Sequence, residues 1–327
     1  MNSAIGGYFE LEFPKAKPFL YPAAYEFQSA RAAFLALLRT GKPSRVYRPH
    51  YICDSMVAPL EKAGVECLFY SIDGEFNING DVELGEADWL FYVNYFGVCE
   101  KNIDGLFHRY NPRQLILDHS QAFYSPPRDC LATIYSARKF FGVPDGGLLL
   151  TGLPIAEPQE SDQESLSRAI SGLTRLAKTP EAGYADYQKA EHSLEQCEPL
   201  KMSQLTRRIL HGIDFEAAKT RRNENFDFLH RHLGSLNQIE LDLQNMDGPL
   251  CYPFLVDSVE LRSHLIRERV FVATYWPETI ARVSNNSHES KFVKSLLPLP
   301  CDQRYGVDAM LRVAEICLDF LSRKKLL

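Results

Sequence analysis

Short apolar runs alternate with stretches of helical periodicity through the first half of the chain. Apolar residues recur near every 3.6 positions over about 25–38, which predicts a helix that Gly41 ends. Apolar runs between turn-forming residues predict strands at 44–48, 66–70, 88–93, 114–117, 131–135 and 147–151. Strands that alternate with helices are typical of a mainly parallel sheet with helices on both faces. We therefore expect a large α/β domain.

The second half begins with a polar, proline-bearing stretch at 152–163 that predicts a surface loop. Helical patterns follow at about 164–177, 184–194, 203–211 and 214–234, and the charge run 220–226 in the last of them is expected to face solvent. From about 235 the pattern alternates again, with strands at 250–256, 270–274 and 296–300 and helices at 259–267 and 307–322. We expect a large domain over 1–234, with an N-terminal arm of about 22 residues, and a small C-terminal α/β domain over 235–327.

A lysine between two of the apolar runs is a candidate for chemistry. Ser136 and Lys139 follow the run at 131–135, and Gly146-Gly147 opens the next run. A lysine held on a rigid turn at the edge of a sheet can be partly desolvated, which lowers its pKa and makes it a nucleophile toward an aldehyde. The serine hydroxyl and the backbone N–H groups of such a turn can hold a phosphate. The combination suits a pyridoxal 5′-phosphate (PLP) site, and a solvated surface lysine is the alternative.

An acidic residue ends the strand expected at 114–117. Residues at the carboxyl end of a strand in an α/β sheet face the ligand crevice, and Asp118 stands at that place. A carboxylate there can pair with the protonated pyridine nitrogen of PLP and keep the ring able to accept electrons. The alternative is an aspartate that caps a helix or turn after a strand.

These residues together resemble a known family. Asp118-x-x-Gln121-Ala122, then Ser136 and Lys139, then Gly146-Gly147, is similar to the DegT/DnrJ/StrS-type sugar aminotransferases, PLP-dependent transferases of the aspartate aminotransferase fold (fold type I). The resemblance implies that Asp118 binds the pyridine nitrogen, that Gln121 contacts the phenolic oxygen of the cofactor, and that Lys139 holds the cofactor as an internal aldimine. It further implies glutamate or glutamine as amino donor, a keto-sugar, often nucleotide-linked, as acceptor, and a homodimer.

The resemblance is looser around the phosphate of the cofactor. Ser29, Ala30 and Arg31 stand where the family has serine, glycine and threonine at the start of a helix, whose N-terminus would point at the phosphate. Arg31 could bind the phosphate directly or be an ordinary exposed arginine. Many relatives carry a serine five residues before the lysine, where this chain has Ile134, and we expect Ser136 to take over its phosphate contact.

Aromatic residues are candidates for stacking on the cofactor ring or for lining the substrate site. Direct counting from Pro49 places the family's stacking position at Cys53, with Tyr51 two residues earlier and Tyr95 as a second candidate. A packed tyrosine is the plainer interpretation of Tyr51. Tyr275 and Trp276 follow an expected strand and either form part of the substrate wall or pack in the core.

Composition narrows the class of protein. The net charge of -6 argues against a general nucleic-acid binder, and no apolar run approaches the roughly 20 residues of a membrane span. The eight cysteines form no Cys-x-x-Cys pair and the histidines are scattered, so we expect no metal site. We also expect a cytoplasmic protein with buried thiols.

The expected function is a PLP-dependent aminotransferase. The alternative is a PLP-fold protein without transaminase activity, a binding or assembly partner in polysaccharide biosynthesis, which the replaced phosphate-cup residues motivate.

Overall fold

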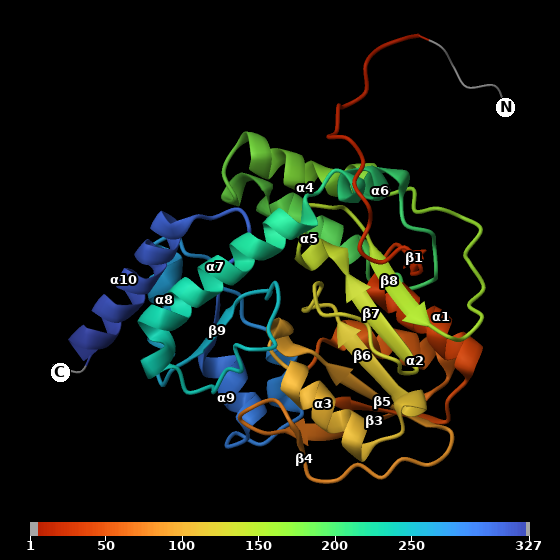
Figure 1. Cartoon of the computed structure of the whole chain (residues 1–327), viewed down its shortest axis with the longest axis horizontal. Helices are drawn as coiled ribbons and strands as arrows, with labels where there is room; N and C mark the ends of the chain where they lie inside the picture. Colours follow the sequence, from red (N-terminus) through yellow and green to blue (C-terminus); the bar gives the residue numbers. More distant parts are fainter. Residues whose placement is uncertain (1–5, 325–327) are drawn as a thin grey trace.

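An eight-stranded sheet forms the centre of the protein, in a computed structural model that describes residues 6–324 (Figure 1). Strands β7, β6, β5, β2 and β3 are mutually parallel neighbours, whereas the pairs β7–β8, β8–β1 and β3–β4 are antiparallel. The mainly parallel α/β sheet predicted from the sequence is therefore confirmed. In spatial order the strands are β1 (Tyr25–Phe27), β8 (Gly147–Thr151), β7 (Ala132–Ser136), β6 (Leu115–His119), β5 (Asp88–Val93), β2 (Arg45–Pro49), β3 (Glu66–Ile72) and β4 (Ile78–Asn79).

The connections of the parallel strands place helices on both faces of the sheet. The crossover from β2 through α2 (Val57–Ala63) leads to β3, and the crossover from β5 through α3 (Glu100–Arg109) leads to β6, in the opposite direction along the sheet. Because such crossovers are right-handed, the two helices lie on opposite faces, and Figure 1 shows α3 in front of the sheet. The reversal lies between β5 and β2, and ligand crevices form at the carboxyl ends of strands at such a point.

Helices α4 to α7 follow the sheet, and a second sheet comes after them. Strands β9 (Tyr252–Leu255) and β10 (Leu296–Leu299) pair antiparallel and are flanked by helices, and α10 packs against α7 and α8. The expected domain boundary near residue 235 stays a prediction, and residues 1–5 and 325–327 of the two expected domains lie outside the described part. The helices are α1 (Ala30–Gly41), α4 (Ser165–Ala177), α5 (Tyr184–Ser193), α6 (Gln204–His211), α7 (Phe215–Leu233), α8 (Glu260–Arg267), α9 (His288–Ser295) and α10 (Val307–Lys324). Short 3-10 helices lie at Asp54–Met56, Tyr95–Gly97, Pro112–Gln114, Ala137–Lys139, Glu181–Gly183, Gly234–Leu236 and Pro277–Ala281.

One expected element begins at the wrong residue, and another is not formed. The helix predicted over 25–38 begins only at Ala30, because Ser29 is extended and its hydroxyl accepts a hydrogen bond from the Ala32 N–H, and the preceding Tyr25–Phe27 is strand β1. The segment 270–274 is not a strand. The guanidinium of Arg262 donates to the Ala273 carbonyl, so a side chain takes the acceptor that a neighbouring strand would use.

The charge run in α7 is also not the solvated face that was expected. Arg222 and Asn225 are buried, and the side-chain amide of Asn225 donates to the carbonyls of Cys301, Asp302 and Tyr305. Buried polar side chains are tolerated where they are hydrogen-bonded in this way. Polar groups of α7 therefore hold the loop before α10.

No helix within residues 6–324 has the length and apolarity needed to cross a membrane. All eight cysteines are free thiols, and six of them are buried.

The glycine pair before β8 fixes the start of α1 against the sheet. The Gly146 N–H donates to the Gln28 carbonyl at 2.8 Å, and a Cβ on Gly147 would lie 2.1 Å from the Ser29 carbonyl carbon. Because the clash is with backbone, we expect Gly147→Ala to lower the free energy of unfolding by about 2–3 kcal/mol. Urea unfolding measures this. Gly142→Ala is the matched control, because a Cβ there meets nothing within 4 Å. Equal stability of the two variants would contradict the account.

Candidate active site

Asp118 lies at the carboxyl end of β6, one strand away from the point between β5 and β2 where the direction of the crossover connections reverses. Its carboxylate is buried, and Oδ1 accepts a hydrogen bond from the Ser120 N–H at 2.9 Å. The Asn94 N–H donates to the Asp118 carbonyl at 3.0 Å and ties this strand end to β5. Burial raises the pKa of Asp118, against the lowering effects of the hydrogen bonds from Ser120 and of the nearby charge of Lys139. The site therefore contains a buried carboxyl group with a lysine charge close by.

Gln121 follows one turn later and holds an irregular piece of backbone. Its Oε1 accepts from the Phe96 N–H at 3.1 Å, and Phe96 has a left-handed φ of 58°. Within residues 6–324, Nε2 of Gln121 is buried and has no hydrogen-bond partner. A buried donor without an acceptor costs stability, so this amide is suited to an acceptor atom of a bound molecule. The backbone strain at Phe96 is of the kind found at ligand sites.

Lys139 ends the 3-10 turn Ala137–Lys139 that follows β7. The turn is tied to the glycine pair, since the Ala137 N–H donates to the Gly146 carbonyl at 3.2 Å. The Lys139 side chain is exposed, and it makes no hydrogen bond or ion pair with the described residues. In the single chain the described residues leave this side chain exposed, so partial desolvation of Lys139 stays a prediction. Its charge nevertheless acts on Asp118.

The start of α1 lies next to the glycine pair of this turn. Its polar side chains make hydrogen bonds to other groups of the same chain. The Ser29 hydroxyl caps the helix, and Nη1 of Arg31 donates to the Leu194 carbonyl at 2.8 Å. Burial lowers the pKa of Arg31, with Cys53 and Arg138 among the groups that also act on it. Arg31 is therefore not the ordinary exposed arginine of the second alternative, and phosphate binding by Arg31 stays a prediction. Ala30 and Cys53 are half-buried beside the core, and Ser136 is buried without a capping hydrogen bond.

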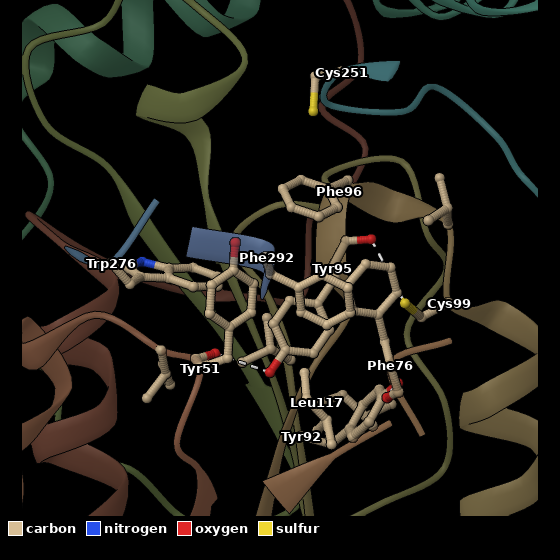
Figure 2. Close-up of a cluster of buried hydrophobic side chains, with 14 of the residues drawn as sticks. Tyr51, Phe76, Tyr92, Tyr95, Phe96, Cys99, Leu117, Cys251, Trp276 and Phe292 are labelled. Atoms are coloured by element: carbon tan, nitrogen blue, oxygen red, sulfur yellow. Dashed lines mark hydrogen bonds between the residues drawn. The ribbon is translucent and has the colours of Figure 1, made fainter. Parts of the chain in front are cut away.

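Three of the aromatic candidates, Tyr51, Tyr95 and Trp276, lie together in one packed cluster (Figure 2). Tyr95 is fully buried, and the rings of Tyr51 and Phe76 lie nearly parallel to it, with centroids 5.7 and 5.0 Å away. Its hydroxyl donates to the Tyr51 carbonyl at 2.9 Å. The structure therefore does not support Tyr95 as the ring that stacks on a cofactor, because neighbouring rings already cover it.

The same cluster contains the two aromatics before Pro277. Trp276 packs edge-on against Tyr51 at 4.6 Å and is buried. These contacts favour the packing interpretation for Tyr51 and Trp276, since stacked and edge-on aromatic pairs stabilise a core. Tyr275 is half-buried, and its ring lies 5.6 Å from that of Phe96, the residue whose N–H donates to Gln121.

Residues that the sequence pattern does not single out connect the candidate site to the rest of the chain. The carbonyl of Phe140, which follows Lys139, accepts hydrogen bonds from Arg222 of α7 and from Gln303. The ion pair between Arg138 and Glu191 joins the same turn to α5. No spacing rule predicts these partners, because they come from segments far away in the sequence. The signal available in the sequence was the charge run 220–226 of α7, which contains Arg222.

Comparisons with known proteins show the fold. No protein-family model matches the chain, and no curated protein is significantly similar to it. Solved structures do match. NtdA from Bacillus subtilis with bound cofactor PMP has a TM-score of 0.64 at 15% identity, over 90% of this chain and 72% of that one. The sugar aminotransferase CalS13 from Micromonospora echinospora has a TM-score of 0.61 at 13% identity, over 90% and 86% of the two chains.

A third solved structure has the same fold. Helicobacter pylori PseC, an aminotransferase involved in the biosynthesis of pseudoaminic acid, has a TM-score of 0.55 at 15% identity, over 90% of this chain and 86% of that one. The chain therefore has the fold of the sugar aminotransferases, as the sequence resemblance implied. Fold alone does not fix activity, which has to be argued from the site.

Proposed function

We propose that this protein is a PLP-dependent aminotransferase that transfers an amino group from glutamate or glutamine to a keto-sugar. The observation that carries the proposal is the pair at the end of β6, where a buried carboxyl group is followed three residues later by a buried amide N–H that finds no partner among the described residues. The sugar aminotransferases of the same fold support the substrate class. A nucleotide on the sugar is part of the same proposal.

The residues present suit the ring of PLP. Asp118 offers a buried carboxylate to the pyridine nitrogen, and Nε2 of Gln121 offers a hydrogen-bond donor to the phenolic oxygen. The charge of Lys139 acts on Asp118, and its amine has no hydrogen-bond or ion-pair partner within residues 6–324. Fewer groups are available to bind the phosphate of PLP, because Ser29 and Arg31 already make hydrogen bonds within the chain. The remaining candidates for the phosphate are Ser136 and the backbone N–H groups at the start of α1.

Bound PLP supplies an electron sink for a carbanion at the Cα of the amino donor. Asp118 would hold the proton on the pyridine nitrogen, and Gln121 would donate a hydrogen bond to the phenolic oxygen. The Nζ of Lys139 would bind the cofactor covalently and, once released, would take the proton from the donor's Cα as a general base and deliver it to C4′ of the cofactor as a general acid. Tyr275 is proposed to border the substrate.

We further propose a cytoplasmic homodimer. Lys139 is exposed on the single chain, and exclusion of water from a reacting lysine requires a cover, which a second subunit would supply. The exposed apolar residues Leu166, Ile170 and Leu173 of α4 offer additional surface for such a contact. Free, mostly buried thiols suit a reducing compartment.

A half-reaction tests the proposal. Purified protein loaded with PLP and given glutamate, without acceptor, should release about one equivalent of 2-oxoglutarate per bound cofactor, and the visible absorbance of the cofactor should fall. Glutamine tests the other donor. Tight PLP binding with neither donor reacting would sink the aminotransferase and leave the non-transaminating partner protein, which the internally used Ser29 and Arg31 favour.

A further inference from the structure

Arg222 on α7 is one of the most deeply buried charged groups in the described part of the chain, with an exposed fraction of 1%. Its Nη1 donates to the carbonyls of Pro249 and Leu250 at 2.9 and 3.3 Å, and its Nη2 donates to the Phe140 carbonyl at 3.2 Å. The guanidinium carbon lies 4.5 Å from the centroid of the Phe140 ring. One side chain therefore joins α7, the turn after Lys139 and the segment that leads into β9.

Stability alone does not account for this arginine. Arg222 forms no ion pair within residues 6–324, and burial lowers its pKa, which shows that the charged form is disfavoured by its surroundings. Even buried ion pairs can often be replaced by apolar residues of similar volume without loss of stability, so a buried charge is weak evidence for a stabilising role. A planar guanidinium can, however, bind several carbonyls in fixed directions, which neither lysine nor an apolar side chain does.

The carbonyls that Arg222 binds lead to the candidate site on both sides. Phe140 is covalently next to Lys139, and its carbonyl also accepts from Nε2 of Gln303 at 2.9 Å. On the other side, the Leu250 N–H donates to the Phe96 carbonyl at 2.8 Å, and the Phe96 N–H donates to Gln121. A continuous chain of hydrogen bonds thus runs from the Lys139 turn through Arg222 to the amide proposed to face the cofactor.

We infer that Arg222 is a positioning residue that fixes the Lys139 turn relative to Gln121 and Asp118, so that the amine and the two ring contacts meet one cofactor. The inference rests on the proposed function for what is being positioned. The geometric part, that Arg222 orders the turn 137–147 and the segment 94–98, stands apart from it. Preorganisation of this kind matters because misplacement of a reacting group by about 1 Å can cost 100-fold in rate.

The test compares Arg222→Gln with Arg221→Gln. Arg221 is the neighbouring arginine of α7, about half exposed and paired with Glu224, so it is the matched control. Two readouts are needed besides turnover: amide hydrogen exchange of peptides covering 94–98 and 137–147, and the visible circular dichroism per bound PLP. We expect Arg222→Gln to speed exchange in both peptides by about tenfold or more and to weaken the dichroism at least about twofold. We expect no change for Arg221→Gln.

The outcomes separate the two claims. A folded Arg222→Gln protein with wild-type exchange in both peptides and wild-type dichroism would overturn the inference. If wild-type protein binds no PLP at all, the proposed function fails, and the exchange comparison still decides whether Arg222 orders the two segments. If Arg222→Gln does not fold, Arg222→Lys, which keeps the charge but not the planar fork, should show the same local pattern. Wild-type behaviour of Arg222→Lys would overturn the inference as well.

Discussion

Replacement of Lys139 by alanine should lower kcat for amino transfer by about 10⁴ or more, because the substitution removes both the covalent attachment and the proton carrier. The effect on folding should be small, within about 0.5 kcal/mol, since the side chain is exposed and unpaired among the described residues. Loss of activity in a stably folded variant therefore reports on chemistry. Steady-state turnover and urea unfolding of the same preparation measure the two quantities.

Lys101→Ala is the control for Lys139→Ala. Lys101 is an exposed lysine of α3, a helix beside the same sheet, and has no proposed role. It should keep wild-type turnover. Amino transfer by Lys139→Ala within a factor of about 10 of wild type would exclude Lys139 as the proton carrier.

Asp118→Asn should lower kcat/KM by about 10²–10⁴, because a neutral amide does not hold the proton on the pyridine nitrogen. The same substitution should leave the cofactor-free protein as stable as wild type or more stable at pH 7. Burial raises the pKa of Asp118. The native state then binds this proton more tightly than the unfolded chain does, so the contribution of Asp118 to stability falls as the pH rises through the raised pKa. Asparagine does not ionise, so the variant does not lose stability in this way as the pH rises.

Asp88→Asn provides a contrast of opposite sign. The Asp88 carboxylate at the start of β5 is buried and accepts two hydrogen bonds from Arg45, which lower its pKa. Its contribution to stability is present above the unfolded pKa and is lost as the pH falls through the lowered folded pKa. Urea unfolding at pH 7 and at about pH 2 should therefore show a destabilisation of Asp88→Asn that is largest at pH 7 and shrinks at the lower pH, with activity retained at pH 7. A clear loss of stability in cofactor-free Asp118→Asn at pH 7 would contradict the account of Asp118.

The central sheet could be predicted because its strands are nearly uniform apolar runs. Strands 88–93 and 147–151 have the predicted bounds, and the parallel arrangement follows from their alternation with helices. The edge strand Tyr25–Phe27 could not be found this way. It is short, and its partner β8 is more than a hundred residues away, so the local pattern merged it with the helix that follows.

Some residues of the candidate site could be predicted from the sequence, and others could not. Asp118, Gln121 and Lys139 could be singled out because they follow the carboxyl ends of predicted strands at spacings that resemble a family. The roles of Tyr95 and Arg222 depend on tertiary contacts. Tyr95 lies among rings from three other segments, and the acceptors of Arg222 are the carbonyls of Phe140, Pro249 and Leu250, which no periodicity in α7 indicates.

Chemical trapping tests the central claim most directly. The protein would be incubated with PLP, reduced with borohydride, digested, and its peptides mapped by mass spectrometry. The account predicts a reduced PLP adduct on Lys139 at sub-saturating PLP, and none on that peptide in Lys139→Ala. Adducts spread over other lysines with Lys139 unmodified, or no adduct at saturating PLP, would contradict the assignment of this site.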